Sequence, residues 1–384
     1  MTQLPYGKHS IDDDDIQAVV DVLRSDWLTT GPKVGELESA LSEYLGTPHV
    51  VAVNSGTAAL HCAMNAIGIG PGDEVIVPAM TFAATANAIL YQRGTPVFAD
   101  VSAGTLLIDP ADVARKITAK TRAIVAVDYA GAACEYDVLR EIANQHRLTL
   151  VADACHSLGG RFGGEKVGTL ADLTCFSMHP VKPITSGEGG IVATSNPFFA
   201  DRMRSFRNHG IDLDFRQRQL AGNWKYSMTE LGFNYRLNDI QCALALSQLK
   251  KLDLWTERRQ QLAKLYDARL AGHRFASPLA RREINEHAFH LYVIRWQHER
   301  CGIGRDAALC WLQSQGIGVN VHYLPVYLHP FYQKRLKISA GLCPVAEQAY
   351  GEILSLPIFP AMTEQNVDDV VGKLVECQRW AKVA

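Results

Sequence analysis

Short apolar runs alternate with amphipathic segments along the first two thirds of the chain. The runs Leu148–Ala152 and Leu173–Met178 have the length of strands, and Pro180 stops the second. The predicted strands are Val50–Val53, Glu74–Val77, Val97–Val101, Ala123–Val127, Leu148–Ala152, Leu173–Met178 and Ile191–Ala193. Apolar residues recur at helical spacing between them, as in Ile16–Leu23 and Lys33–Tyr44. This alternation predicts an α/β fold with a mostly parallel sheet sandwiched by helices.

The last third of the chain has a different pattern. Apolar and charged residues recur at helical spacing from Asp239 to Leu270, which predicts a long linking helix with a break near Asp253. The elements predicted beyond it are a strand at Ala288–Trp296, a helix at Arg305–Gln315 closed by Gly316, a strand at Ile317–Tyr323 and a helix capped by Thr363. We expect a large α/β domain at residues 1–250 and, at residues 251–384, the linking helix with a smaller C-terminal α+β domain.

Composition and charge narrow the class of protein. The chain has 384 residues, of which 47% are hydrophobic and 20% are charged, and its net charge is -2. These values fit a globular protein large enough for two domains, and they favour neither nucleic acid nor an acidic membrane as a partner. The polar start at Met1–Asp15 lacks the apolar core of a signal peptide, and no run approaches the ~20 apolar residues of a membrane-spanning helix. We therefore expect a cytoplasmic protein.

Cysteine and histidine spacing gives no metal signature. The nine cysteines include no CxxC pair, and the thirteen histidines include no HExxH motif. Scattered cysteines of odd number fit reduced thiols better than a disulfide framework. Cys155 and Cys175 lie in or just after predicted strands, where a small buried hydrophobe is the simpler role. We expect no bound metal.

Two ionisable residues follow neighbouring predicted strands. Asp153 comes directly after Leu148–Ala152, and Lys182 follows the strand that Pro180 stops. A lysine amine can hold the aldehyde of pyridoxal 5'-phosphate as a Schiff base and then move protons, while a buried carboxylate keeps the pyridine nitrogen protonated. Each residue alone would more simply be a solvated loop lysine or a helix cap. Together, at the edge where open α/β sheets bind ligands, they predict a pyridoxal phosphate site with Lys182 as the catalytic residue.

A phosphate anchor is predicted where a strand turns into a helix. Ser55, Gly56 and Thr57 follow Val50–Val53 and open an alanine-rich helix, whose N–H groups and dipole favour an anion. Alone, this pattern would be an ordinary helix cap. The run Gly187–Gly190 precedes a strand, whereas a dinucleotide-binding glycine motif must open a helix, which argues against a dehydrogenase.

Five motifs resemble those of one family, in its order and at its spacing. They are Asn54–Leu60, Asp153 with His156, Phe176–Lys182, Gly187–Gly190 and Gly232–Arg236. These motifs are similar to those of the DegT/DnrJ family of nucleotide-sugar aminotransferases, and the resemblance covers essentially the whole chain. It implies a fold type I pyridoxal phosphate-dependent transferase.

The resemblance implies roles for the residues around the cofactor. Ser55, Gly56, Thr57 and Ser177 would contact the phosphate, Phe82 would stack on the pyridine ring, and Asp153 and His156 would contact the cofactor. Asn234 would reach the cofactor phosphate of a neighbouring chain, which implies a homodimer with shared active sites. Without the resemblance, Phe82 would be ordinary core and His156 a polar turn residue.

Two further features bear on the partner chain and the amino donor. The polar segment Ile211–Ser227 is poorly suited to internal packing and is suited to reach another subunit. Arg236 is a candidate for a bidentate contact with the carboxylate of the donor.

The resemblance also implies a substrate. Tyr6, Leu28, Thr29, His322 and Tyr323 lie in segments that would line the sugar-nucleotide pocket; His322 and Tyr323 would equally suit a buried polar pair between domains. These segments most resemble family members that make UDP-4-amino-4,6-dideoxy-N-acetyl-β-L-altrosamine in pseudaminic acid biosynthesis. The implied reaction moves an amino group from an amino acid, expected to be L-glutamate, to C4 of the UDP-linked 4-keto-6-deoxy-N-acetyl sugar UDP-2-acetamido-2,6-dideoxy-β-L-arabino-hex-4-ulose.

Three alternatives stay open on the sequence. The enzyme could aminate another 4-keto or 3-keto nucleotide sugar, because such specificity depends on single hydroxyl groups. A pyridoxal phosphate-dependent sugar dehydratase ranks lower, since related dehydratases carry histidine where this chain has Lys182. A non-catalytic regulator or sugar-binding protein could share the fold, because fold does not determine function.

Overall fold

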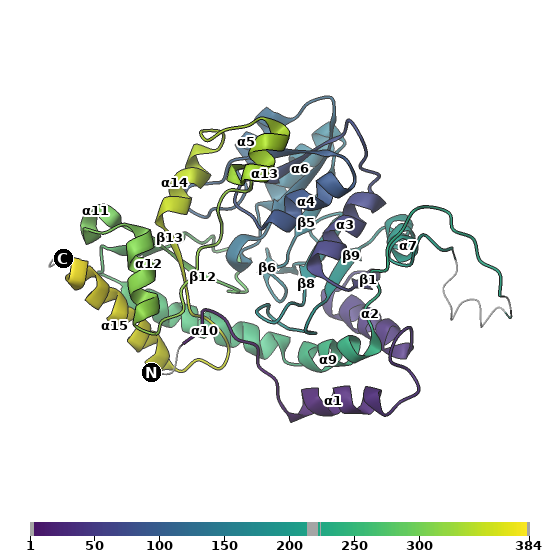
Figure 1. Ribbon diagram of the computed structural model, residues 1–384, viewed down its shortest axis with the longest axis horizontal. Helices are drawn as coiled ribbons and strands as arrows, with labels where there is room; N and C mark the ends of the chain where they lie inside the picture. The colour runs from purple at the N-terminus through teal and green to yellow at the C-terminus, as the bar shows by residue number, and fades with distance from the viewer. Residues whose placement is uncertain (1–3, 213–221, 223, 382–384) are drawn as a thin grey trace.

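A computed structural model describes residues 4–212, 222 and 224–381, and its described part contains a large seven-stranded sheet (Figure 1). The strands lie in the order β1 (His49–Val53), β9 (Gly190–Thr194), β8 (Leu173–Ser177), β5 (Thr149–Asp153), β4 (Thr121–Val127), β2 (Glu74–Pro78) and β3 (Thr95–Ala99). Strand β9 pairs antiparallel with β1 and β8, and the other neighbours are parallel. The mostly parallel sheet is confirmed, although β3 begins and ends two residues earlier than its predicted run.

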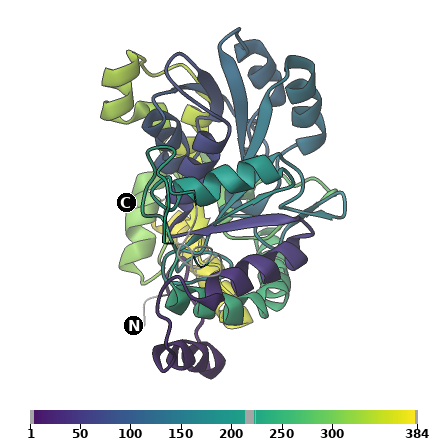
Figure 2. The ribbon, with the colours of Figure 1, turned by 90° about the vertical axis from the view of Figure 1, so that its right-hand side faces the viewer.

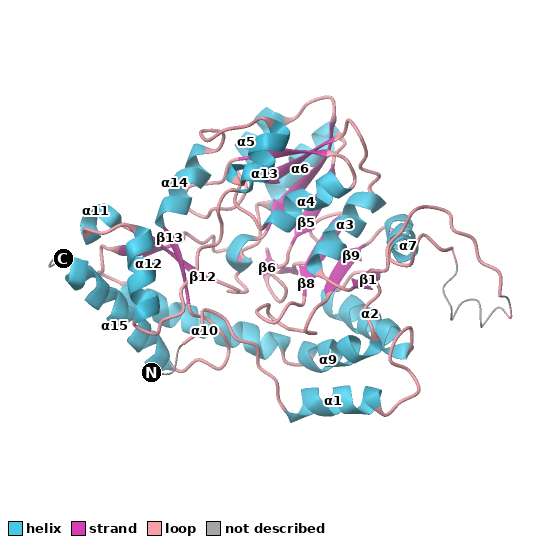
Figure 3. Cartoon of the chain, in the orientation of Figure 1, coloured by secondary structure: helices cyan, strands magenta, loops and turns pink. Residues whose placement is uncertain are grey.

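Helices flank this sheet, with the strands in the middle of the molecule (Figures 2 and 3). They are α2 (Pro32–Leu45), α3 (Gly56–Ala66), α4 (Ala83–Tyr91), α5 (Pro110–Lys116), α6 (Tyr136–His146) and α7 (Pro197–Phe206), whereas α1 (Asp13–Leu23) packs on α9 (Asp239–Leu249). Helix α3 packs on β1, β8 and β9 and also against α4 and α7. All of its residues except Thr57 are buried, which explains why its sequence is alanine-rich rather than amphipathic.

Two consecutive helices lead from the large sheet toward the C-terminal part (Figure 1). The predicted long helix is broken into α9 (Asp239–Leu249) and α10 (Leu252–Leu270), close to the expected position. Beyond α10 lies an antiparallel sheet of β10 (Ala276–Pro278), β12 (Tyr292–Trp296) and β13 (Ile353–Leu356). The helices near this sheet are α11 (His298–Cys301), α12 (Arg305–Ser314) and α15 (Glu364–Ala381), while α13 (Pro330–Leu336) and α14 (Pro344–Glu352) pack against the cluster of the large sheet.

Buried apolar side chains form two clusters. One surrounds the large sheet, and the other gathers Tyr266, Trp296 and Leu374 between α10, the small sheet and α15. Leu291 and Val293 belong to the first cluster although they lie beyond residue 250. The division at residues 250 and 251 therefore stays a prediction. A third small sheet, β11 (Asn285–Glu286), β6 (Arg161–Phe162) and β7 (Glu165–Lys166), connects the two parts.

Two strand predictions in the C-terminal part are wrong in whole or in part. The segment Ile317–Tyr323 is no strand: it makes only single bridges, from Ile317 to Leu4 and from Asn320 to Ser355. The Asn320 side chain accepts the Val321 N–H, so this amide does not enter a ladder. The strand predicted at Ala288–Trp296 begins only at Tyr292, since Ala288 N–H and Leu291 N–H donate to the 130–131 turn instead. Most of the polar segment Ile211–Ser227 lies outside the described residues.

A buried aspartate holds the loop between α1 and α2. Asp239, which is fully buried, accepts the N–H groups of Gly31 and Lys33 at 2.8 and 2.9 Å. Its own N–H donates to the Leu28 carbonyl. A Cβ on Gly31 would lie 2.6 Å from the Asp239 carboxylate, so only glycine allows this approach. The first residue of α9 thus caps α2 and positions the loop that carries Leu28 and Thr29.

We predict that Asp239→Asn lowers the free energy of unfolding by about 1 to 3 kcal/mol, because the new amide presents N–H groups to a backbone donor. Urea unfolding of purified protein measures the change. The matched control is Asp369→Asn, which alters an exposed carboxylate on α15 and should stay within about 0.5 kcal/mol of wild type. Equal stabilities for the two variants would contradict the capping role of Asp239.

Candidate active site

The residues predicted to bind the cofactor converge at the carboxyl ends of β5 and β8. Asp153 is the last residue of β5 and pairs in register with Cys175 of β8, and Ser177 ends β8. Helix α3 begins against both strands: a Cβ on Gly56 would lie 2.8 Å from Ser177 Cβ and 3.4 Å from Cys155 Sγ. The structure therefore brings Ser55, Gly56, Thr57, Asp153 and Ser177 together.

The start of α3 forms a cradle for an anion. Ser55 caps the helix by accepting the Ala58 N–H at 3.1 Å. Within the described residues, the N–H groups of Gly56 and Thr57 have no acceptor, as is usual in a first helical turn. Gly190 passes so close that any side chain there would overlap the Ser55 carbonyl group, which explains a glycine in the Gly187–Gly190 run. The cradle and the Ser177 hydroxyl beside it suit a phosphate group.

Asp153 is 6% exposed, and its carboxylate has two donors. Thr85 Oγ1 donates to Asp153 Oδ2 at 2.7 Å, and Cys155 N–H approaches Oδ1 at 3.3 Å. An ionised carboxylate has about four acceptor positions, so room is left for a further donor such as a protonated pyridine nitrogen. Thr85 was not predicted from the sequence. The available signal was the four-residue spacing of Thr81 and Thr85 across the start of a helix.

Lys182 lies partly exposed on the loop after β8. Burial of the amine lowers the pKa of Lys182, while the nearby Cys155 thiol and Asp153 carboxyl groups act in the opposite direction. A lowered pKa increases the fraction of neutral amine, which is the form that attacks an aldehyde.

Histidines surround this amine. Burial lowers the pKa of His156, His290 and His322, and the Lys182 charge lowers it further. For His322 the pKa falls to about 4. These three rings are therefore neutral near Lys182.

Hydrogen bonds and ring contacts join the predicted cofactor and substrate residues. Tyr323 OH lies 3.1 Å from His156 Nε2, and the Tyr323 ring lies 6.0 Å from that of Phe82. His322 contacts the Tyr6 ring at 5.4 Å and the Ser355 hydroxyl at 2.8 Å. Phe82 is 60% exposed, so one face of its ring is open to a ligand. Tyr6, Phe82, His156, His322 and Tyr323 thus form one continuous wall.

His290 is a second residue that sequence reasoning missed. Its ring centroid lies 4.4 Å from that of His156, and the Nδ1 atoms of both are buried without a hydrogen-bond partner in the described part of the chain. Gly131 permits this contact, because a Cβ there would lie 2.9 Å from His156 O and 3.1 Å from His290 N. No local sequence pattern marks His290, since the turn at Gly131 that positions it is distant in sequence.

Four other predicted residues lie farther out. Leu28 and Thr29 are exposed on the loop held by Asp239. Asn234 is exposed, and its carbonyl oxygen lies 3.4 Å from Asn54 Nδ2. Arg236 donates to Asn208 Oδ1 at 2.7 Å. The roles assigned to these residues in substrate, partner-chain and donor binding stay predictions.

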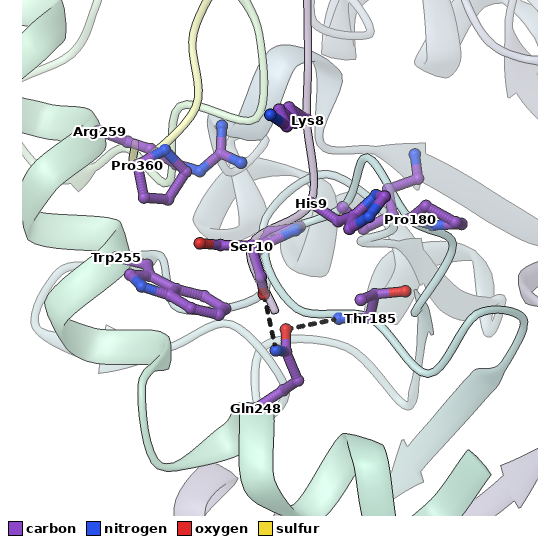
Figure 4. A pocket seen from close by; sticks show the side chains of 11 residues that line it. Lys8, His9, Ser10, Pro180, Thr185, Gln248, Trp255, Arg259 and Pro360 are labelled. Carbon is purple, nitrogen blue, oxygen red and sulfur yellow. Dashed lines mark hydrogen bonds between the residues drawn. The ribbon is translucent and has the colours of Figure 1, made fainter. Parts of the chain in front are cut away.

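A small cavity lies beside the loop that carries Lys182 (Figure 4). Lys8, Pro180 and Thr185 are among its lining residues, with Gln248 and Arg259 from α9 and α10. The Gln248 amide joins three segments by binding Ser10 O at 3.0 Å, Asp15 Oδ2 at 2.6 Å and Thr185 N at 3.4 Å. Arg259 is 2% exposed, and burial lowers its pKa to about 10. The residues that line this cavity thus hold the loop that carries Lys182 in place.

The residues at this edge fit pyridoxal phosphate. The α3 cradle and Ser177 suit the phosphate, Asp153 has free acceptor positions, and burial lowers the pKa of the Lys182 amine. Over residues 4–212, 222 and 224–381, no group of His, Cys, Asp or Glu is arranged to hold a metal ion. No helix in that part of the chain is long and apolar enough to cross a membrane.

Comparisons with known proteins agree with this geometry. A model of the DegT/DnrJ/EryC1/StrS aminotransferase family matches residues 9–375. The spore coat polysaccharide biosynthesis protein SpsC of Bacillus subtilis is 37% identical over 373 residues, which are 96% of this chain and 95% of that protein.

Two solved structures are similar over nearly their full lengths. Spr1654 of Streptococcus pneumoniae, described as a sugar aminotransferase and solved in its PMP form, has a TM-score of 0.92 and 33% identity, covering 98% of this chain and 99% of that one. Helicobacter pylori PseC, an aminotransferase involved in the biosynthesis of pseudoaminic acid, has a TM-score of 0.91 and 32% identity, covering 98% and 100%.

The neutral histidines predict an acid-sensitive fold. Four buried histidines have pKa values below the usual 6.5: His61, His156, His290 and His322. Below pH 6.5 these side chains therefore bind protons in the unfolded chain and stay neutral in the folded chain. Stability should be fully present above pH 6.5 and fall toward pH 4, by up to about 1.4 kcal/mol per pH unit for each ring. Asp128, whose pKa burial raises to about 6, opposes this trend between about pH 4 and 6.

Urea unfolding between pH 7.5 and 5 measures the dependence. His61→Gln should reduce the slope, whereas His298→Gln, on the surface, should leave it unchanged. A free energy of unfolding that is constant across this range would contradict the neutral assignment.

Proposed function

The chain belongs to the DegT/DnrJ/EryC1/StrS aminotransferase family, and we propose that it moves an amino group from L-glutamate to C4 of a UDP-linked 4-keto-6-deoxy-N-acetyl sugar. It is a pyridoxal phosphate-dependent sugar aminotransferase, like its structural neighbours. The specific substrate, UDP-2-acetamido-2,6-dideoxy-β-L-arabino-hex-4-ulose on the pseudaminic acid route, rests on the similarity to PseC and on the Tyr6, Leu28 and Tyr323 segments.

One observation carries the proposed active site. Lys182 has an amine with a lowered pKa, and it lies within electrostatic reach of Asp153 and Cys155 at the edge where α3 begins. When bound there, pyridoxal phosphate supplies an aldehyde that takes up amino groups and a ring that withdraws electrons. The Asp153 carboxylate would accept a hydrogen bond from the protonated ring nitrogen, and the α3 cradle with Ser177 would anchor the phosphate.

Side chains of the protein perform the proton transfer and shield the site. Lys182 Nζ anchors the cofactor between turnovers and, once released, takes a proton from one carbon atom and returns it to another. The neutral wall of His156 and Tyr323 holds this amine among groups that do not compete for the proton. The exposed ring of Phe82 would cover one face of the pyridine ring and limit the access of water.

The substrate pocket is proposed on the other side of the same wall. Tyr6 and His322 lie in ring contact, and Tyr323 links them to His156. Their hydroxyl and imidazole groups suit the hydroxyl and phosphate groups of a sugar nucleotide. Leu28 and Thr29 would close the mouth from the loop that Asp239 holds.

We further propose a homodimer in which Asn234 reaches the phosphate site of the partner. An exposed apolar stretch supports this: Trp224, Met228 and Leu231 are 80%, 66% and 79% exposed in the isolated chain. Apolar side chains gathered in this way on one segment are typical of protein interfaces.

One observation also favours a different keto sugar as the substrate. SpsC, at 37% identity, is named for spore coat polysaccharide biosynthesis, so another 4-keto or 3-keto nucleotide sugar fits the family equally. A panel of UDP- and TDP-linked keto sugars, incubated with glutamate and analysed by mass spectrometry for aminated products, separates the candidates. Lys182 argues against the dehydratase, and consumption of glutamate would exclude a purely binding role.

We predict that Lys182→Ala lowers the rate of amino transfer by at least about a thousandfold, because both the anchor and the proton carrier are lost. Single-turnover conversion of glutamate, followed by the visible absorbance of the cofactor, measures the effect. Lys373→Ala, an α15 surface variant, should match wild type. Undiminished transfer by Lys182→Ala would refute the assignment.

We predict that Tyr6→Phe raises KM for the nucleotide sugar about tenfold, because one hydrogen bond to the sugar is lost. The rate of the reaction with glutamate alone should not change. The Tyr6 hydroxyl has no hydrogen-bond partner within the described residues, so it is available to a ligand. Steady-state kinetics with varied sugar and a separate glutamate half-reaction test this. The control is Tyr91→Phe at the exposed end of α4; a change in the glutamate rate in Tyr6→Phe would place Tyr6 elsewhere.

A further inference from the structure

Two threonines at the start of α4 direct their hydroxyls toward Asp153: Thr85 lies in the first turn, and Thr81 precedes the N-cap. Thr81 Oγ1 lies 2.7 Å from Thr85 Oγ1, and Thr85 Oγ1 lies 2.7 Å from Asp153 Oδ2. Both threonines are 1% exposed, so water does not compete for these contacts. The two hydroxyls and the carboxylate form an unbroken buried chain.

The direction of this chain depends on the charge of Asp153. An ionised carboxylate can only accept, so the single hydroxyl hydrogen of Thr85 must point at Oδ2. Thr81 must then donate to Thr85. The opposite direction would need a hydrogen on Asp153, and its last hydroxyl, that of Thr81, would need an acceptor. Aligned hydroxyls of this kind strengthen one another in a buried site, so the chain holds the carboxylate in one orientation.

Among the contacts of the Asp153 carboxylate, the hydrogen bond from Thr85 is the main one made by a side chain. The Cys155 N–H reaches Oδ1 at the long distance of 3.3 Å. Burial raises the pKa values of the Cys155 and Cys175 thiols, so neither adds a negative charge beside the carboxylate. The Lys182 amine lies within electrostatic reach of Asp153.

The same helical turn carries the proposed stacking ring. Phe82 is the N-cap of α4, and Thr85 N–H donates to its carbonyl at 3.2 Å. The start of α4 therefore fixes the position of the Phe82 ring relative to the Thr85 hydroxyl, which would place one on the pyridine face and the other beside the carboxylate at its edge.

We propose that Thr85 is a positioning residue that holds the Asp153 carboxylate aimed at the pyridine nitrogen, with Thr81 fixing the direction of its hydroxyl. The inference rests on the proposed function, since it assumes that the cofactor lies between Lys182 and Asp153. A merely structural threonine would tolerate valine, which has the same shape and lacks the hydroxyl. Thr85→Val therefore isolates the hydrogen bond.

The chain offers a matched control in Thr174 of β8. This threonine is also 1% exposed, and its hydroxyl has no hydrogen-bond partner among the described residues. It lies on the strand next to Asp153, since Thr174 pairs with Ala152. Thr174→Val makes the identical chemical change without touching the carboxylate.

The experiment loads each protein with pyridoxal phosphate labelled with ¹⁵N in the ring and records the nitrogen resonance. We expect a protonated ring nitrogen in wild type, Thr85→Ser and Thr174→Val, and a shift toward the neutral nitrogen in Thr85→Val. We expect kcat to fall about tenfold in Thr85→Val, the effect of one hydrogen bond to a charged group, with KM for the sugar unchanged. Thr81→Val should give a smaller shift in the same direction.

The outcomes separate this inference from the proposed function. If Lys182→Ala loses amino transfer but Thr85→Val keeps the wild-type nitrogen resonance, the positioning role is overturned and the function stands. If Lys182→Ala keeps amino transfer, the proposed site itself fails. Where Thr85→Val does not retain the cofactor, Thr85→Ala is measured with the same two readings.

Discussion

The active site depends on burying an amine and a carboxylate at one edge of a parallel sheet. Removing a charged amine from water is costly, so burial favours the neutral form of Lys182, which is the nucleophile. Asp153 and Cys155 oppose this effect without cancelling it. The sheet makes this arrangement possible, because the adjacent strands β5 and β8 end together, and the start of α3 approaches them through glycine.

The histidine and tyrosine side chains around the Lys182 amine are uncharged. The rings of His156, His290 and His322 and the phenol of Tyr323 are uncharged because they are buried, and they separate the cofactor edge from the proposed sugar pocket. Such a wall can hydrogen-bond a polar substrate without trapping protons that Lys182 must exchange. Amino donor and sugar would meet the same amine in turn, so discrimination between sugars falls to hydroxyl groups such as that of Tyr6.

The elements that local patterns encode were predictable, and those that distant contacts create were not. Strands β5, β8 and β9 follow from continuous apolar runs, and Asp12 and Asp15 form the capping box that starts α1. The predicted strand at Ile317–Tyr323 failed because its single bridges go to Leu4 and Ser355, which no local pattern reveals. Thr85 and His290 were missed for the same reason: Thr85 serves a carboxylate 68 residues away. The family motifs led to the prediction of Lys182 and Asp153, whereas no motif marks Thr85 or His290.

The most direct test of the account identifies the lysine that carries the cofactor. Reducing the cofactor-loaded protein with sodium borohydride fixes the linkage, and proteolysis with mass spectrometry locates the labelled peptide. The account predicts one modified residue, Lys182, in the peptide that follows β8. A label on any other lysine, with Lys182 unmodified, would contradict it.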